Sequence, residues 1–285
     1  MRVIEPSQLK RSSIKKKRSK KAPLLAVLLL LVLAGLAIWR LVEPKPIQPE
    51  NTTQVANSEL SEKPALTEEK KKTTFKNFTN QEFVAFYSNF AYPNTAEITL
   101  PPAITGNAEA DLRIRTLAEE RGYKLRSAPI SKPIALENGM FVQQKAAQPY
   151  KDMIAAAQKE GLNITMTAAF RSVDEQKQLF LERLAPSPAS IAAGTADAAV
   201  LETLKSTAPP GYSRHHNGFT IDIACGNIGL YGFLDTPCFT WLAKDNFKNA
   251  KEYGWIPSYP DGVNSVGPEP EPWEYVWVGR DSLLE

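Results

Sequence analysis

The residues best suited to chemistry fall in three short segments of this 285-residue sequence, at positions 169–172, 210–222 and 271–277. The middle segment contains both histidines of the chain, and the last contains two glutamates separated by two residues. Imidazole and carboxylate groups serve proteins as metal ligands and as general bases. These three segments are therefore the candidate sites of chemistry, and the secondary structure around them has to bring them together.

The two histidines, His215 and His216, do not by themselves define a metal site. Neighbouring side chains of an extended segment point to opposite faces, so the two rings could not readily meet one ion. An isolated histidine pair is more often structural than metal-binding. Further ligands from other segments are needed for a metal site.

The three segments follow one another in a recognisable pattern. The residues that carry it are Phe170-Arg171-Ser172 with Gln176, then Ser213-x-His215-x-x-Gly218-x-x-x-Asp222, and finally Glu271-x-Trp273-Glu274. In this order, over about residues 105–280, the chain resembles the VanY-type D-alanyl-D-alanine carboxypeptidases, zinc peptidases that trim peptidoglycan stem peptides. The stretch at residues 254–260 also resembles that family.

The resemblance implies specific roles. His215 and Asp222 would bind the metal, and Glu271 would be the general base that acts on metal-activated water. Arg171 would hold the substrate carboxylate or the developing oxyanion, so that it is catalytic as well as substrate-binding. The full set implied to contact the substrate is Arg171, Ser172, Gln176 and Ser213. The implied reaction is hydrolysis of the terminal D-alanine peptide bond, either D,D or L,D.

Plainer roles are open for three of these residues. Ser172 begins a Ser-x-x-Glu capping box and is equally suited to capping a helix. Gln176 fits an ordinary surface position of that helix, and Arg171 fits a solvated charge at a strand end. Trp273 and Trp277 are expected in the core or the pocket wall.

The sequence departs from the family at position 274, where the third ligand, a histidine, is replaced by Glu274. A glutamate oxygen can bind zinc, so His215, Asp222 and Glu274 form a chemically possible ligand set for Zn²⁺. Two carboxylates also favour harder divalent ions such as Mn²⁺. Three functions remain open: an active metallopeptidase, a degenerate domain that binds cell-wall peptides without cleaving them, and a metal-dependent amidase or endopeptidase acting on another wall bond.

Charge divides the chain into unlike parts. Residues 1–21 hold nine basic residues and one acidic residue, a net charge of +8, and the remainder carries −5 within the total of +3. Residues 22–42 are apolar enough for a transmembrane anchor, with a cleaved signal sequence as the alternative. Positive residues favour a cytoplasmic N-terminus, which places the body in the periplasm or outside the cell. An exported acidic body argues against a nucleic-acid partner.

The remaining organisation follows from composition and periodicity. Residues 43–77 predict a flexible spacer, residues 78–138 an accessory region and residues 139–285 a VanY-like peptidase domain. Helical spacing is seen at residues 109–121, 150–160, 196–205 and 241–253, and strand patterns surround Asp222 and Trp277. Helices and short strands without regular alternation predict an α+β fold. The resemblance implies a single catalytic domain with a small antiparallel sheet flanked by helices, as in DD-peptidases and Hedgehog-like domains. The oligomeric state is not encoded in any visible pattern.

Cys225 and Cys238 are the two cysteines of the chain. Export supplies an oxidising setting and no other thiol competes, so a disulfide between them is expected. The alternative is a pair of buried free thiols.

Overall fold

The computed structural model describes residues 74–285. The basic segment 1–21, the apolar segment 22–42 and nearly all of the predicted spacer lie outside the described residues. Among residues 74–285, no helix combines the length and the apolar character needed to cross a membrane.

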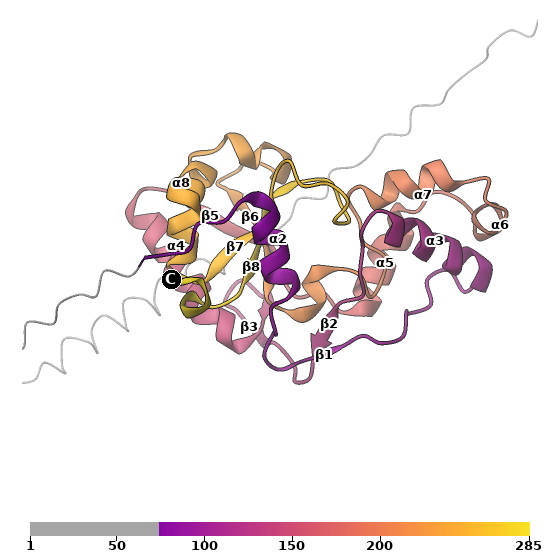
Figure 1. Ribbon diagram of the computed structural model, residues 1–285, viewed down its shortest axis with the longest axis horizontal. Helices are drawn as coiled ribbons and strands as arrows, with labels where there is room; N and C mark the ends of the chain where they lie inside the picture. Colours follow the sequence, from indigo (N-terminus) through magenta and orange to yellow (C-terminus); the bar gives the residue numbers. More distant parts are fainter. Residues whose placement is uncertain (1–73) are drawn as a thin grey trace, which may run out of the picture. The chain divides into compact units, whose positions relative to one another are not determined.

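A four-stranded antiparallel sheet forms the centre of the fold, in the order β5-β6-β8-β7 (Figure 1). Its strands are β5 (Ile164–Ala168), β6 (Thr220–Cys225), β7 (Trp255–Tyr259) and β8 (Glu271–Trp277). Every residue of β6 is buried, since this central strand is covered on both faces. Two further pairs of very short strands are β1 (Thr95–Glu97) with β2 (Ser127–Pro129), and β3 (Ile134–Ala135) with β4 (Phe141–Val142). The α+β class with a small antiparallel sheet is confirmed.

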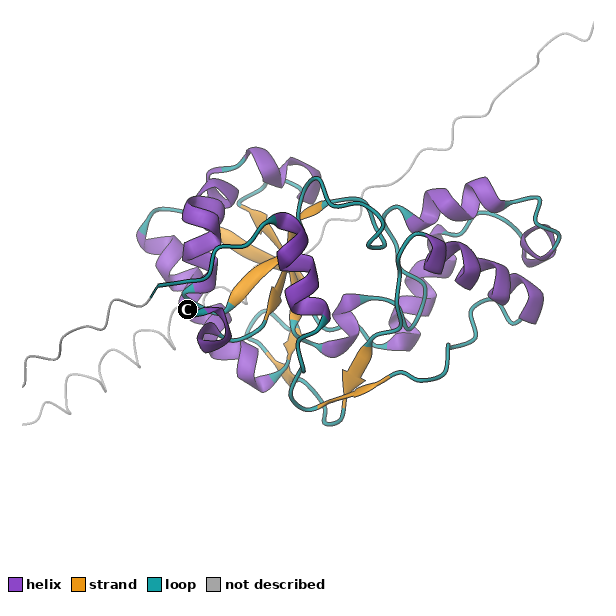
Figure 2. Cartoon of the chain, viewed as in Figure 1, coloured by secondary structure: helices purple, strands orange, loops and turns teal. Residues whose placement is uncertain are grey.

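The larger hydrophobic core lies between this sheet and its covering helices. The helices are α2 (Asn80–Ser88), which contacts β7, together with α4 (Gln144–Lys159) and α8 (Pro237–Lys251), which contact each other and the sheet. Figure 2 shows the strands of the sheet surrounded by these helices. Ile221, Trp255 and Tyr275 are among its fully buried members. A short helix, η3 (Arg280–Leu283), ends the chain on this core.

A second, smaller core lies mainly among helices. It is formed by α3 (Ala108–Glu120), α5 (Val173–Arg183), α6 (Pro188–Ala192) and α7 (Asp197–Leu204), which bury Ile114, Phe180 and Val200. Figure 1 shows α3, α6 and α7 together at one end of the described part. Residues 78–138 supply α2 to the first core and α3 to the second, and the predicted boundary at residue 139 stays a prediction.

The predicted helices are present, with different ends. Helix α4 begins at Gln144, six residues before the predicted start, because Ala146 and Ala147 are buried against the sheet core. Helix α8 begins at Pro237 under the Thr236 cap and contains four non-helical residues, 244–247, so the predicted uninterrupted helix 241–253 is wrong there. Helices α2 and α6 were not predicted.

The predicted disulfide between Cys225 and Cys238 is confirmed. It joins the end of β6 to the first turn of α8, where the two Cα atoms lie 5.8 Å apart. The loop that it closes contains η2 (Leu230–Asp235) and reaches the candidate site through Leu230 and Tyr231.

Candidate metal centre and active-site cleft

Sheet register brings two of the predicted ligands together. Asp222 on β6 pairs directly with Glu274 on the antiparallel neighbour β8. Directly opposed residues project from the same face of a sheet, with Cβ atoms about 4.5–5.5 Å apart. Their carboxylates therefore converge although 51 positions separate them in sequence.

Glu271 reaches the same cleft because β8 is irregular. In β7, Pro257 pairs with Tyr275 but Tyr259 pairs with Glu271, a register shift that inserts extra residues into β8. Such irregularities re-aim side chains. As a result Glu271 and Glu274 both line the cleft, although they are three residues apart on one strand.

His215 enters from a single turn of 3₁₀-helix, η1 (Arg214–Asn217), immediately before β6. The Ser213 hydroxyl accepts a hydrogen bond from the His215 backbone amide, and Gly218 ends the turn at φ +76°, a left-handed conformation that glycine adopts without strain. The ring Nδ1 lies 2.7 Å from the Ala169 carbonyl oxygen. Because a carbonyl only accepts, Nδ1 carries the hydrogen and Nε2 faces the two carboxylates.

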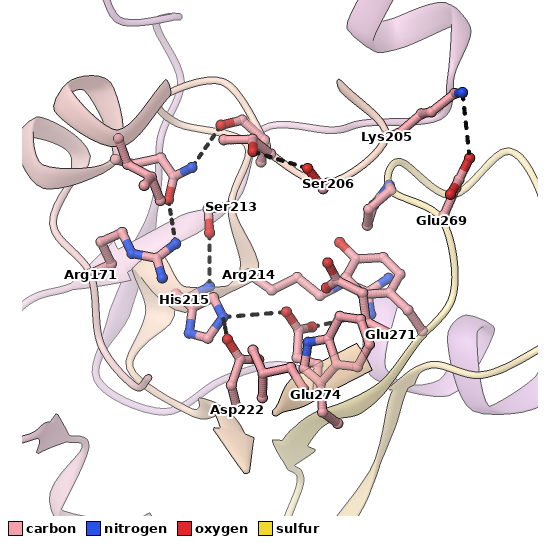
Figure 3. A pocket seen from close by; sticks show the side chains of 18 of the residues that line it. Arg171, Lys205, Ser206, Ser213, Arg214, His215, Asp222, Glu269, Glu271 and Glu274 are labelled. Atoms are coloured by element: carbon pink, nitrogen blue, oxygen red, sulfur yellow. Dashed lines mark hydrogen bonds and ion pairs between the residues drawn. The ribbon is translucent and has the colours of Figure 1, made fainter. Parts of the chain in front are cut away.

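The three side chains have the spacing of a metal-binding set. His215 Nε2 lies 3.5 Å from Asp222 Oδ2 and 3.3 Å from Glu274 Oε2. Ligand atoms held about 2.0–2.2 Å from a tetrahedral zinc ion lie about 3.3–3.6 Å from one another. Asp222 Oδ1 and Glu274 Oε1 are buried and have no hydrogen-bond partner among the described residues. Both distances and donor types thus fit zinc. Figure 3 shows the three side chains pointing toward one another.

Burial and mutual charge set the protonation of this cluster. Burial disfavours the charged imidazole, but Asp222 and Glu274 raise the pKa of His215 to about 10. This places an imidazolium between two carboxylates, and a metal ion bound there would displace that proton. Burial raises the pKa of Glu271 well above its usual range, and Glu274 and Asp222 raise it further. A carboxylate with a raised pKa is a suitable proton acceptor.

The cluster lines a cleft of 180 Å³ with two unlike walls (Figure 3). One wall consists of the acidic residues on β6 and β8, with the aromatic pair Trp273 and Tyr231 at its edge. The opposite wall is cationic and comes from the loop before α5 and from the ends of α5 and α7; its members are Arg171, Arg183 and Lys205. A site with this pairing can polarise a bond on one side and hold an anionic group on the other.

Comparison with known proteins identifies the family. Residues 139–280 match the family model described as VanY, D-alanyl-D-alanine carboxypeptidase. This part of the chain belongs to the VanY family. The chain is 27% identical over 151 residues to a D-alanyl-D-alanine carboxypeptidase of Enterococcus faecalis, a match covering 53% of each protein. It spans about half the length of the curated relatives it matches.

Two solved structures are also similar. One is the vancomycin resistance D,D-pentapeptidase VanY from a VanB-type resistance cassette, a mutant in complex with Zn(II): 21% identity, TM-score 0.40, covering 56% of this chain and 82% of that one. The other is the LdcB LD-carboxypeptidase: 26% identity, TM-score 0.41, covering 54% and 66%.

Within this VanY-family site, His216 is separated from His215, but not for the predicted reason. The segment is a 3₁₀ turn and not extended. His216 Nδ1 lies 2.7 Å from the Arg171 carbonyl oxygen, and its Nε2 accepts the Gly211 amide at 3.0 Å. Burial lowers the pKa of His216 to about 4. The neutral ring therefore ties the Arg171 backbone to the 209–212 turn.

Arg171 and Gln176 act as a pair in the cationic wall. Arg171 Nη1 donates to Gln176 Oε1 at 2.8 Å, and Gln176 Nε2 donates to the Ala208 carbonyl at 2.7 Å. Gln176 is almost fully buried, so it is not an ordinary surface residue. Its amide is already engaged in holding Arg171, which makes it a positioning residue.

The other two predicted substrate contacts differ from each other. Ser213 lines the cleft and also caps η1. Ser172 caps α5: its hydroxyl accepts from the Glu175 amide, and Glu175 bonds back to the Ser172 amide. Ser172 is not among the residues that line the cleft, so the structure assigns it the capping role.

Sequence reasoning missed Arg214. It is fully buried behind the ligands, and its guanidinium lies between the rings of Tyr87 and Tyr259. Arg214 lies inside the motif, between Ser213 and His215. The motif allows any residue at this position, so nothing in the sequence singled it out. Lys205 and Tyr231 were missed as well because their elements reach the cleft only through tertiary packing.

Proposed function

We propose that this protein is a cell-envelope metallo-carboxypeptidase that hydrolyses the terminal D-alanine peptide bond of peptidoglycan stem peptides. The observation that carries the proposal is the buried His215, Asp222 and Glu274 cluster with Glu271 beside it and Arg171 across the cleft. Membership of the VanY family and the name of the enterococcal relative support the substrate class. We also propose that the domain has the architecture of the DD-peptidases.

Zinc is the ion that the distances and donor types favour, and His215, Asp222 and Glu274 would hold it. When bound by these residues, zinc would supply Lewis-acid chemistry, which lowers the pKa of water and polarises a carbonyl group. Other divalent ions compete at such an oxygen-rich site.

The protein's own groups supply the remaining steps. Arg171, fixed by Gln176, pairs with the substrate's terminal carboxylate or with the oxyanion. Glu271 accepts a proton from the attacking water while the oxygen of that water bonds to the carbonyl carbon of the scissile peptide. When the carbon–nitrogen bond breaks, Glu271 returns that proton to the leaving amine of D-alanine. Burial of the cluster strengthens each of these electrostatic contacts.

One observation favours a second function, a domain that binds cell-wall peptides without cleaving them. Two positive charges balance the carboxylates of Asp222 and Glu274, because the raised pKa of His215 makes it an imidazolium and Arg214 lies 3.8 Å from Glu274. A cluster satisfied in this way can persist without metal, while Arg171 still offers a cation to a peptide carboxylate.

The location in the cell envelope is part of the proposal. The Cys225–Cys238 disulfide supports an oxidising compartment, which agrees with an exported body. The N-terminal apolar segment would anchor the chain in the membrane, with the cleft on the outer side.

The test combines metal analysis with digestion. The full chain, loaded with zinc and dialysed, should retain about one zinc ion and release D-alanine from a muropeptide pentapeptide, detected by mass spectrometry. A tetrapeptide assayed in parallel separates D,D from L,D cleavage. Peptide binding without zinc retention or cleavage would establish the binding-domain function instead.

A further inference from the structure

The substitution of glutamate for histidine at position 274 has a counterpart 3.8 Å away. Arg214 Nη1 lies at that distance from Glu274 Oε1, and the two side chains are only 2% and 5% exposed. Charges this deeply buried have lost their water, so each depends on the other for compensation. A buried cation next to the unusual ligand therefore calls for an explanation.

The arginine is held in place by contacts with residues other than the glutamate as well. Its guanidinium carbon lies 3.8 Å from the centre of the Tyr87 ring and 3.2 Å from the centre of the Tyr259 ring. Nη1 donates to the backbone carbonyl and the hydroxyl of Ser258. A guanidinium stacked and bonded in this way is a fixed positive charge, since arginine stays protonated in proteins.

The glutamate is oriented between two cations. Its Oε1 faces Arg214 and its Oε2 faces His215, at 3.8 Å and 3.3 Å. Oε1 has no hydrogen-bond partner within residues 74–285, and it is attracted by the charge of Arg214, while the Ser258 hydroxyl also helps to lower the pKa of Glu274. Attraction at Oε1 leaves Oε2 turned toward Asp222 and His215, where a metal ligand has to be.

With Arg214 included, the net charge of this site equals that of the ligand set implied by the family resemblance. Two histidines and one aspartate, the set that the resemblance implies, carry a net charge of −1. His215, Asp222 and Glu274 carry −2 with a neutral imidazole, and the positive charge of Arg214 returns the group to −1.

We propose that Arg214 is a positioning residue that compensates the charge of Glu274 and directs its Oε2 into the metal site, which allows glutamate to act as the third ligand. This inference rests on the proposed function. The competing explanation is that Arg214 merely fills the space between Tyr87 and Tyr259.

A double-mutant cycle in the full chain separates the two. Arg214→Met is made alone and together with Glu274→Gln, and thermal unfolding of the metal-free proteins is followed by circular dichroism. Charge compensation predicts that Arg214→Met lowers Tm by at least about 5 °C more when Glu274 is present than in the Glu274→Gln background. Arg214→Lys, which keeps the charge, should recover part of that difference. Equal losses in both backgrounds would overturn the proposal, because lost packing does not depend on the charge at position 274.

Zinc affinity, measured by competition with a chromophoric chelator, provides the second readout. Glu274→His leaves Arg214 as a surplus cation, so this substitution alone should weaken zinc binding. Adding Arg214→Met should then tighten binding at least about tenfold, whereas Arg214→Met alone should not tighten it, because Glu274 loses its orientation. The same gain in both backgrounds would contradict the proposal.

Folding and function failures are distinguishable. If Arg214→Met and Arg214→Lys both fail to fold in either background, Arg214 is required for packing and the proposal is wrong. If the unsubstituted protein binds no zinc, the proposed function fails with it. If zinc binds but the two substitutions act independently, only the role of Arg214 fails.

Discussion

The two walls of the cleft are built in different ways. The acidic wall lies on neighbouring strands, where the pairing of Asp222 with Glu274 and the packing around β6 leave its ligands buried. The cationic wall comes from helix ends and loops, and its outer member Lys205 has a side chain that is 41% exposed. Sheet register holds groups at fixed spacing, whereas long side chains at helix ends adapt to a partner.

Under the proposed function, this difference would give the two walls different tasks. Bond cleavage needs groups placed within fractions of an ångström, which suits the acidic wall. Capture of a peptide carboxylate tolerates more freedom, which suits the cationic wall. Within the cationic wall Arg171 is the exception, since Gln176 fixes it. Substitutions in and behind the two walls test this division.

Glu271→Gln should lower kcat for D-alanine release about 10³-fold, because a proton acceptor contributes about 10²–10⁴-fold to such reactions. Zinc retention should be unchanged, since Glu271 is not in the ligand cluster. The control is Glu269→Gln, which changes the same residue type at the exposed rim and should stay within about twofold. Equal losses of kcat in the two variants would contradict the role of Glu271 as the buried general base.

Arg171→Met should lower kcat/KM about 10–100-fold, since a hydrogen bond to a charged group contributes about 1.5–3 kcal/mol. Steady-state kinetics on the pentapeptide provides the measurement. Lys205→Met is the matched control in the same wall, and a loss below about fivefold is expected because its partners are solvent-exposed. If Lys205→Met lowers kcat/KM more than Arg171→Met does, the proposal that Arg171 is the main substrate-binding cation of this wall is wrong.

Asp111→Asn tests what stabilises the helical core behind the cationic wall. Burial opposes ionisation of Asp111, yet three hydrogen bonds from Thr105 and Ile104 lower its pKa overall. Because the folded pKa is below the unfolded value, its contribution is present above about pH 4 and is lost as the pH falls further. The variant should lose about 2 kcal/mol at pH 7 and depend less on pH below 4, as measured by urea unfolding. An unchanged acid profile would show that another carboxylate is responsible.

Ser172→Ala should cost about 1 kcal/mol of stability through loss of the α5 cap. Catalysis should change little once the protein is folded, because Ser172 does not line the cleft. Ser172→Asp preserves a capping side chain and should restore the stability. A large rise in KM for Ser172→Ala at full stability would instead return Ser172 to the substrate contacts that the family resemblance implies.

Local signals predicted much of this fold. The capping box at Ser172 and Glu175 marked the start of α5, and the α3 and α7 boundaries lie within a residue of the predicted ones. The errors have physical causes. Helix α4 starts before the predicted apolar positions because Ala146 and Ala147 are buried in the core. Helix α8 is interrupted at residues 244–247, where Asn246 exchanges hydrogen bonds with the Phe78 backbone.

The sequence by itself determined which residue types stand in the cleft, because His215, Asp222, Glu271 and Glu274 belong to an ordered pattern that can be read without coordinates. It also determined the cysteine pair. Only the tertiary structure decided that Asp222 and Glu274 face each other, that Gln176 holds Arg171 and that Arg214 lies behind Glu274. The reason is that motif order records chain positions, whereas strand register and the burial of charge depend on contacts between distant segments.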